Sequence, residues 1–371
     1  MTSSGFALVV PGRLDQRTGG YLYDARIVHE LRLAGTHVDV HEVEGRFPDV
    51  DESSKKQLHA ALGSIPEGSP VVIDGLAMGG APDVIEAHAD RLCIVALVHH
   101  PLADETGLGP KERARFEALE RDALAHARGV VVTSPYTARR LEAFGVSADR
   151  VHAVTPGTDP SPQAEGPSAG DPPLLLCVGT VTPRKGHDVL LRALARIVDL
   201  EWRCACAGSL ERAPEFVADV LASASRLGLG DRVRFLGELD REMLDSLYRR
   251  ASLFVLPSHY EGYGMAFAEA LARGLPVVGT NGGAIPDTVP DTVGVLVPTG
   301  DDEALAEALR SLLASEARRK ALTLRARTHA ERLPGWAEQA RAFAAAVRLV
   351  VVDDRTEGVA AVRGARAPGS R

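Results

Sequence analysis

Two carboxylates, Glu261 and Glu269, bracket a glycine-containing turn and are the side chains in this sequence best suited to chemistry. An apolar run at 253–256 precedes the turn and predicts a buried strand, and helix-forming residues from Ala266 onward predict a helix. The free N–H groups that begin a helix attract phosphate, whereas a nearby carboxylate is unfavourable unless it accepts hydrogen bonds from hydroxyl groups. The spacing of the two acids is also typical of a helix surface, but the strand and the glycines favour a ligand with hydroxyls on both sides of its phosphates, such as a sugar nucleotide.

A pair of adjacent cations stands in a similar setting earlier in the chain. Arg184 and Lys185 follow an apolar run at 174–178 and a turn that begins at Gly179, and a helical pattern comes next. The planar guanidinium of arginine can hold two phosphate oxygens, and the ammonium of lysine supplies a compact charge. The alternative is a solvated pair ahead of a surface helix. The position after the carboxyl end of a predicted buried strand favours phosphate binding.

Two further groups follow predicted strands in the first half of the chain. Gly19 and Gly20 precede a helix and would let a ligand approach the backbone, although a flexible turn explains them equally well. His99 and His100 end a buried strand, and because adjacent strand residues face opposite sides, at most one of them faces a ligand. A capping or core role for this histidine stays open.

The run 257–278 resembles the donor site of the retaining glycosyltransferases of family 4, which have the GT-B architecture. It reads Pro-Ser-x-x-Glu-Gly-x-Gly up to Gly264 and continues from Glu269 as Glu-Ala-x-Ala-x-Gly-x-Pro-Val-Val. The segment that contains Lys185 resembles the Val-Gly-Arg-x-x-x-x-Lys-Gly element of the same family, with Thr180 where that family often has arginine. This departure puts more of the expected phosphate binding on Arg184.

The resemblance implies a role for each of these residues. It places Arg184 and Lys185 on the donor diphosphate. It assigns hydroxyls of the ribose to Glu269, a hydroxyl of the sugar to Glu261, and the sugar itself to His99, with His100 as the second choice. The residues expected to be catalytic are therefore Arg184, Lys185, Glu261 and His99. The residues expected to bind the donor are Gly19, Gly20, Gly179, Thr180, Leu236, Gly262, Tyr263, Gly264, Met265 and Glu269.

The order of predicted elements indicates an α/β protein with two doubly wound parallel sheets. Apolar runs alternate with helical patterns at 6–10, 38–43, 71–74, 92–98, 130–133 and 151–154, and again at 174–178, 203–207, 233–236, 253–256, 277–278 and 293–297. We expect an acceptor domain over 1–160, a Pro- and Gly-rich linker over 161–173, and a donor domain over 174–334. In the resembled family the domains are Rossmann-like and face a central cleft. There the last helix, here about 335–352, returns to the first domain, and we expect 353–371 to be a disordered tail.

The composition excludes several classes of protein. The 371 residues are 45% apolar and 25% charged with a net charge of −8, which is typical of a globular protein and argues against nucleic-acid binding. We expect no membrane span and no signal peptide, hence a cytoplasmic protein, while peripheral membrane contact stays open. The four cysteines fall in apolar runs. Cys204 and Cys206 share a strand face, and we interpret them as buried residues because no second pair at ligand spacing accompanies them.

We therefore predict a retaining glycosyltransferase that moves a hexose from a UDP- or GDP-sugar to an unidentified acceptor. The alternatives are an inverting transferase or a sugar-nucleotide epimerase of the same architecture, or a non-catalytic protein that binds sugar nucleotides. We expect no cofactor and no required metal ion. The Asp-x-Asp at 49–51 imitates a metal-binding motif but lies in a polar stretch rather than at the end of a buried strand.

Overall fold

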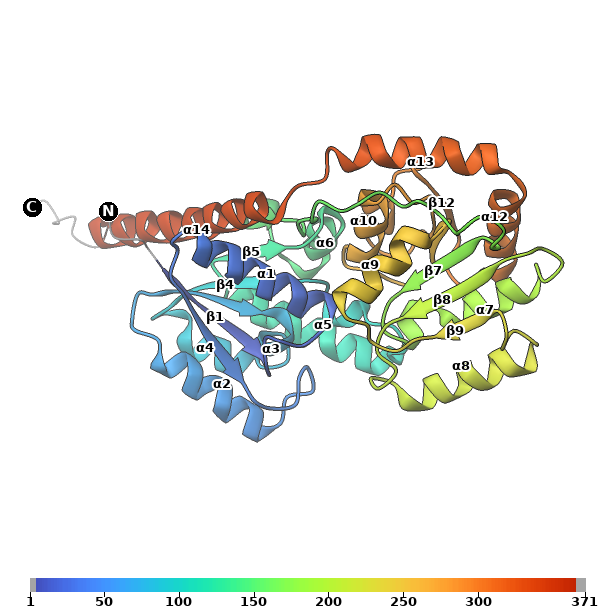
Figure 1. Cartoon of the computed structure of the whole chain (residues 1–371). Coiled ribbons are helices and arrows are strands. Elements are labelled where there is room, and N and C mark those ends of the chain that lie inside the picture. Colours follow the sequence, from blue (N-terminus) through green and yellow to red (C-terminus); the bar gives the residue numbers. More distant parts are fainter. Residues whose placement is uncertain (1–4, 365–371) are drawn as a thin grey trace, which may run out of the picture. The chain divides into compact units, whose positions relative to one another are not determined.

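The computed structural model describes residues 5–364, and the side chains of residues 5–352. The chain forms two units (Figure 1). The first contains the N-terminal part up to Asp104, Leu108–Pro156 and the C-terminal segment from Trp336. The second contains Glu105–Gly107 and Gly157–Gly335. Each unit has a parallel six-stranded sheet, as the alternation of apolar runs and helical patterns predicted.

The sheet of the first unit has the strand order β2-β1-β3-β4-β5-β6. Its strands are β1 (Phe6–Pro11), β2 (Val38–Val43), β3 (Pro70–Asp74), β4 (Cys93–Val98), β5 (Gly129–Val132) and β6 (Val151–Ala153). Its helices are α1 (Gly19–Leu33), α2 (Glu52–Ser64), α3 (Gly75–Met78), α4 (Pro82–Ala89), α5 (Pro110–Ala125), α6 (Pro135–Leu141) and α14 (Trp336–Gly364), with 3-10 turns at Leu102–Asp104, Glu142–Phe144 and Ala148–Arg150.

The sheet of the second unit has the order β12-β11-β10-β7-β8-β9. Its strands are β7 (Leu174–Val178), β8 (Arg203–Ala207), β9 (Val233–Phe235), β10 (Leu253–Leu256), β11 (Val277–Thr280) and β12 (Gly294–Val297). Its helices are α7 (His187–Ala195), α8 (Pro214–Arg226), α9 (Arg241–Arg250), α10 (Met265–Ala272), α11 (Ile285–Thr288), α12 (Asp302–Ala314) and α13 (Glu316–Ala330), with a 3-10 turn at Pro183–Lys185.

Each sheet reverses its winding direction once, and this reversal places the loops that matter for function. In the first unit the chain moves from β1 outward to β2 and then back across to β3, so the reversal lies between β1 and β3. In the second unit the corresponding pair is β7 and β10. Loops that leave the carboxyl ends of two such strands diverge to opposite faces of the sheet and leave room for a ligand between them.

The segment between the two sheets, which the sequence predicted to be a linker, has no helix or strand over 161–173. Its backbone nevertheless pairs with the second unit: the Ala164 N–H donates to the carbonyl of Arg273 and the Glu165 N–H to that of Arg249, both at 2.8 Å. The segment is therefore held by backbone hydrogen bonds despite its polar composition.

Helix α14 packs on α1 in the first unit, and Figure 1 shows the two helices side by side. The Tyr23 ring lies 6.1 Å from that of Trp336 and 6.5 Å from that of Phe343, and Phe6 of β1 lies 6.0 Å from Phe343. The helix extends to Gly364, further than the end near 352 that the sequence indicated. The remainder of the expected tail, 365–371, lies outside the described residues.

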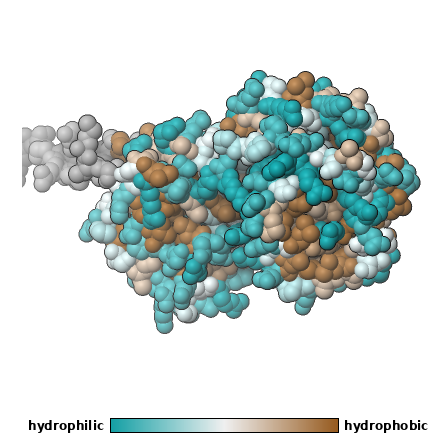
Figure 2. Space-filling view, viewed as in Figure 1, coloured by the Kyte–Doolittle hydropathy of each residue, from teal (hydrophilic) through white to brown (hydrophobic). Residues whose placement is uncertain are grey.

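On the face seen in Figure 2, hydrophilic side chains predominate and hydrophobic ones gather in separate patches. Among the described residues, no helix has both the length and the apolar character that crossing a bilayer requires.

Truncation of Phe343 should test how much the packing of α14 stabilises the first unit. Phe343 is 1% exposed, so Phe343→Ala should lower the free energy of unfolding by about 3–5 kcal/mol through lost burial and the cavity left behind. The control is Leu349→Ala on the same helix, where the side chain is 54% exposed and the expected change is within about 0.5 kcal/mol.

Each unit contains one tryptophan, Trp336 in the first and Trp202 in the second. Denaturant unfolding followed by fluorescence in a Trp202→Phe background therefore reports the first unit through Trp336. Equal loss of stability in the two variants would contradict this account of the packing.

Candidate active site

The loops that follow β7 and β10 meet where the winding of the second sheet reverses. The loop after β7 contains the 3-10 turn with Arg184 and Lys185, and the carbonyl of Arg184 accepts a hydrogen bond from the N–H of His259 at 2.7 Å. Between this turn and α7 stands Gly186, with a φ of +67°. A Cβ at this position would lie 2.2 Å from the carbonyl oxygen of Pro257, so only glycine allows the two loops to come this close.

The side chains of these two loops form an ion-pair network around Glu261. The Nζ of Lys185 lies 2.6 Å from Oε1 of Glu261, and the hydroxyl of Ser258 donates to the same oxygen at 2.6 Å. The NH1 of Arg184 lies 3.4 Å from Oε2 of Glu261 and donates to the carbonyl of Tyr260 at 3.0 Å. The network therefore joins two residues of the β7 loop to the turn before α10.

Burial strengthens this network. The side chains of Lys185 and Glu261 are 15% and 7% exposed. Burial alone would raise the pKa of Glu261, but Lys185 and Arg184 outweigh burial and lower it, so the carboxylate is ionised. Burial lowers the pKa of Lys185, and Glu261 opposes that effect. Arg184 also lies 3.4 Å from Glu105, an acid that is 41% exposed and whose attraction water screens.

The residues that open the loop after β7 lie beneath the lysine. A Cβ at Gly179 would lie 3.4 Å from Cδ of Lys185, so the lysine side chain passes directly over this glycine. The N–H of Gly179 donates to the carbonyl of Ala207 at 2.9 Å, and Thr180 is half-buried beside it. Gly179 therefore lies next to the ion pair, and donor binding by Gly179 and Thr180 stays a prediction.

Helix α10 begins without a side-chain cap, directly after the turn that contains Glu261. Gly264 stands at the N-cap position with a φ of +91°, and no side chain there accepts a hydrogen bond from the first turn. The segment Gly262, Tyr263, Gly264 and Met265 leads into this helix end. Uncapped amides at a helix N-terminus carry partial positive charge and suit an anion.

Glu269 lies on α10 and belongs to a second group of polar side chains. Its Oε2 accepts a hydrogen bond from the hydroxyl of Tyr248 on α9 at 3.1 Å, and its carbonyl accepts one from Arg273 at 3.1 Å. Burial raises the pKa of Glu269, which Arg273 partly offsets. Leu236, which directly follows β9, is half-buried, and its N–H donates to the carbonyl of Cys206 at 2.9 Å.

In the first unit, His99 follows β4 and its ring contacts two carboxylates that the sequence did not single out. Its Nε2 lies 3.2 Å from Oδ1 of Asp24 and 3.3 Å from Oδ2 of Asp74. Asp24 is on α1 and Asp74 ends β3, so three elements converge here. A Cβ at Gly20 would lie 3.1 Å from the ring, which explains a glycine at this position. Gly19, which begins α1, has open space at its Cβ position.

The two acids control the protonation of His99, whose side chain is 16% exposed. Burial alone would lower the pKa of His99, but Asp24 and Asp74 outweigh it and raise the pKa to about 10. Burial raises the pKa of Asp24 to about 6, against the attraction of His99. Asp74 could have been recognised as a candidate site residue, because it stands at the carboxyl end of a predicted buried strand. Asp24 lies inside a helix, and nothing in the sequence around it indicates a site.

The stability of the first unit should depend on the protonation of His99. Because the folded chain holds the proton more tightly than the unfolded chain, whose histidine titrates near 6.5, this contribution is complete below pH 6.5 and is lost as the pH rises toward about 10. Unfolding free energies of the native chain and His99→Asn, measured with the Trp336 reporter, should therefore converge over this range. A difference that stays constant from pH 6.5 to 10 would contradict the paired arrangement.

Two family models match this chain. The "Glycosyl transferases group 1" model matches residues 161–329, and the "Glycosyl transferase 4-like domain" model matches residues 57–157. The first range contains Arg184, Lys185, Glu261 and Glu269, and the second contains Asp74 and His99, whereas Gly20 and Asp24 lie before it.

Curated relatives and a solved structure agree with these models. The D-inositol 3-phosphate glycosyltransferase of Xylanimonas cellulosilytica is 35% identical over 63% of this chain and 60% of its own length. The enzyme of that name from Saccharomonospora viridis is 33% identical over 73% and 66%. The chain thus spans less than two thirds of the length of these relatives. The structure of sucrose-phosphate synthase from Thermosynechococcus elongatus superposes with a TM-score of 0.79 at 23% identity, covering 94% of this chain and all of that one. The chain therefore belongs to the group 1, family 4-like glycosyltransferases, and its fold is of the GT-B type.

Proposed function

We propose that this protein is a retaining glycosyltransferase that transfers a hexose from a nucleoside diphosphate sugar to an acceptor. We place the donor diphosphate at the loops after β7 and β10 of the second unit. The observation that carries this proposal is the convergence of Arg184 and Lys185 on Glu261 where the winding of the sheet reverses. Family membership supports the reaction class.

The chemistry of such a transfer develops negative charge on the departing diphosphate. Lys185 supplies a compact positive charge and Arg184 a planar donor group, and both are already held in place by neighbouring atoms. The uncapped start of α10 adds backbone donors from the other loop. Groups that are oriented before the reaction stabilise a developing charge without reorganisation, and this is a large part of catalysis in many enzymes.

The carboxylates have separate roles in this proposal. Oε1 of Glu261 is shared by Lys185 and Ser258, while Oε2 makes the longer 3.4 Å contact with Arg184 and retains capacity for a hydroxyl donor. We assign this oxygen to the sugar. Glu269 would accept ribose hydroxyls, with Tyr248 fixing its orientation. The contact of His99 with the sugar stays a prediction. Because Asp24 and Asp74 keep the imidazole protonated, the ring would approach the sugar as a hydrogen-bond donor.

The Lys185→Ala variant should test the diphosphate assignment. Without the ammonium, the charge on the leaving group is less well stabilised, and kcat should fall by about 10²–10³-fold. The matched control is Lys320→Ala on α13 of the same unit, where the lysine side chain is 77% exposed and activity should be unchanged. Transfer at a near-native rate by a folded Lys185→Ala protein would remove the assignment.

The donor should be identified by the sugar nucleotide that raises the melting temperature of the protein. The stereochemistry of the transfer should be read from the anomeric configuration of the product. A ligand that binds the folded chain raises its melting temperature, so a series of UDP-, GDP- and ADP-sugars should contain one that stabilises the protein. Transfer from that donor is then assayed with a series of acceptors. The series includes D-inositol 3-phosphate, which appears in the name of the relatives. NMR should show the donor's anomeric configuration retained. Inversion would indicate an inverting transferase, and binding with neither transfer nor donor hydrolysis would indicate a non-catalytic binding protein.

A further inference from the structure

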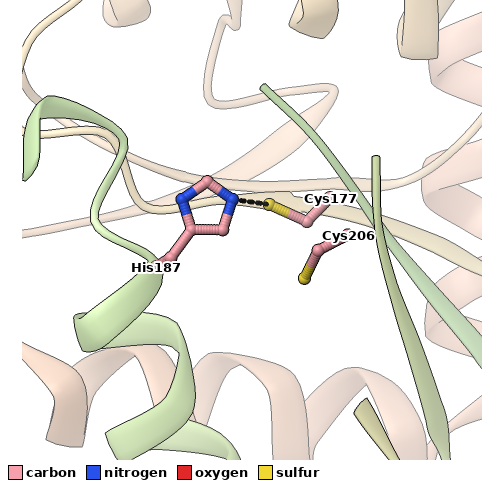
Figure 3. A group of neighbouring side chains, drawn as sticks. All are labelled: Cys177, His187 and Cys206. Atoms are coloured by element: carbon pink, nitrogen blue, oxygen red, sulfur yellow. Dashed lines mark hydrogen bonds between the residues drawn. The ribbon is translucent and has the colours of Figure 1, made fainter. Parts of the chain in front are cut away.

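Three soft ligand groups meet in the core of the second unit, beside the proposed donor site. Cys177 is on β7, Cys206 is on β8, and His187 is the first residue of α7. Their side chains are fully buried, with exposures of 0%, 2% and 0%. One ligand atom from each lies within 4.8 Å of the other two, and Figure 3 shows the imidazole with a nitrogen toward Cys177 and with the Cys206 sulfur nearby. We call this group the Cys–His cluster.

One distance within the cluster is close to the spacing of neighbouring ligands around a metal ion. The Sγ of Cys177 lies 3.7 Å from Nε2 of His187. Zinc–sulfur and zinc–nitrogen bonds of about 2.3 Å and 2.1 Å separate neighbouring ligands of a tetrahedral site by roughly 3.5–3.8 Å. A further sulfur is at hand, because the Sγ of Cys204 lies 4.0 Å from that of Cys206.

Ordinary core packing does not account for the histidine. A buried imidazole is costly unless polar partners satisfy it. Nε2 of His187 faces a thiol, which is a weak partner, and Nδ1 has no hydrogen-bond partner among the described residues. A cation bound at Nε2 would give that nitrogen a strong partner in place of the thiol, with the proton of the ring on Nδ1.

The two cysteines, the histidine and the net charge of the bound group together favour Zn²⁺ over other cations. Thiolate and imidazole suit d¹⁰ ions such as Zn²⁺, whereas Mg²⁺ and Ca²⁺ need oxygen ligands. Binding of Zn²⁺ by two thiols releases two protons to solvent, forms two Zn–S bonds and one Zn–N bond, and leaves no net charge on the buried group. Neutrality matters because an uncompensated charge at full burial is strongly unfavourable.

We propose that Cys177, His187 and Cys206 bind one Zn²⁺ ion in the core of the second unit. The ion would join β7, β8 and α7 and fix both ends of the segment 178–186, which contains Arg184 and Lys185. It would be structural, since its ligands are buried. An effect of the ion on glycosyl transfer rests on the donor site proposed above, whereas the binding of the ion does not depend on that proposal.

The proposal is tested on the full chain without any activity assay. Protein purified without chelator and with a reductant should contain one zinc per chain by elemental analysis. After zinc is removed, titration with Co²⁺ should give the strong absorption of thiolate-to-cobalt charge transfer, saturating at one equivalent, and Zn²⁺ should abolish this absorption. Added Zn²⁺ should also raise the melting temperature of the metal-free protein.

Cys177→Ala and Cys206→Ala should each lose the bound zinc and the cobalt absorption. The matched control is Cys93→Ala, which removes a buried cysteine from the first unit and should keep both. The wild-type titration does not depend on whether the variants fold. Absence of zinc together with absence of the cobalt–thiolate absorption would overturn the proposal, as would equal loss of metal in Cys93→Ala. If zinc binds as expected while Lys185→Ala retains full activity, the donor assignment fails and the metal site stands.

Discussion

The ion pair between Lys185 and Glu261 is the interaction on which the second unit's site depends. It links two loops that leave neighbouring strands toward opposite faces of the sheet, and it is buried enough for the charges to matter. Gly186 makes the link possible, because any side chain there would collide with the backbone after β10. A buried carboxylate with partners from both loops would be costly to leave unpaired, so the network also specifies how the loops fit together.

The two units share a sheet topology but place opposite charges where the winding of the sheet reverses. Both sheets are parallel, six-stranded and reverse once, and both place ionisable groups at the reversal. In the second unit two cations surround one carboxylate, which favours an anionic ligand. In the first, two carboxylates surround His99 and retain a proton on it. The same sheet topology therefore carries different ionisable side chains in the two units.

Strands and loop positions could be predicted from the sequence because they depend on local patterns. Apolar runs predicted all twelve strands, and the glycines with Arg184, Lys185 and Glu261 marked the loops that the structure brings together. Contacts that depend on tertiary packing could not be predicted. Asp24 is a helical residue with no motif around it, and the residues of the Cys–His cluster come from three elements whose spacing matches no metal-binding pattern. The expectation that the last helix ends near 352 relied on the composition after 353 and its lack of periodicity, and the helix continues to Gly364.

The packing of α14 on α1 has a consequence for the order in which the protein is made. The first unit is assembled from both ends of the chain, while nearly all of the second is one continuous stretch between them. During translation, Phe6 and Tyr23 must therefore wait for Phe343, which leaves the ribosome only after the whole second sheet has been synthesised. Until then the nascent chain exposes an apolar surface, and exposed surfaces of this kind are what chaperones bind. The second unit can fold as it emerges, so the half of the molecule that begins first is completed last.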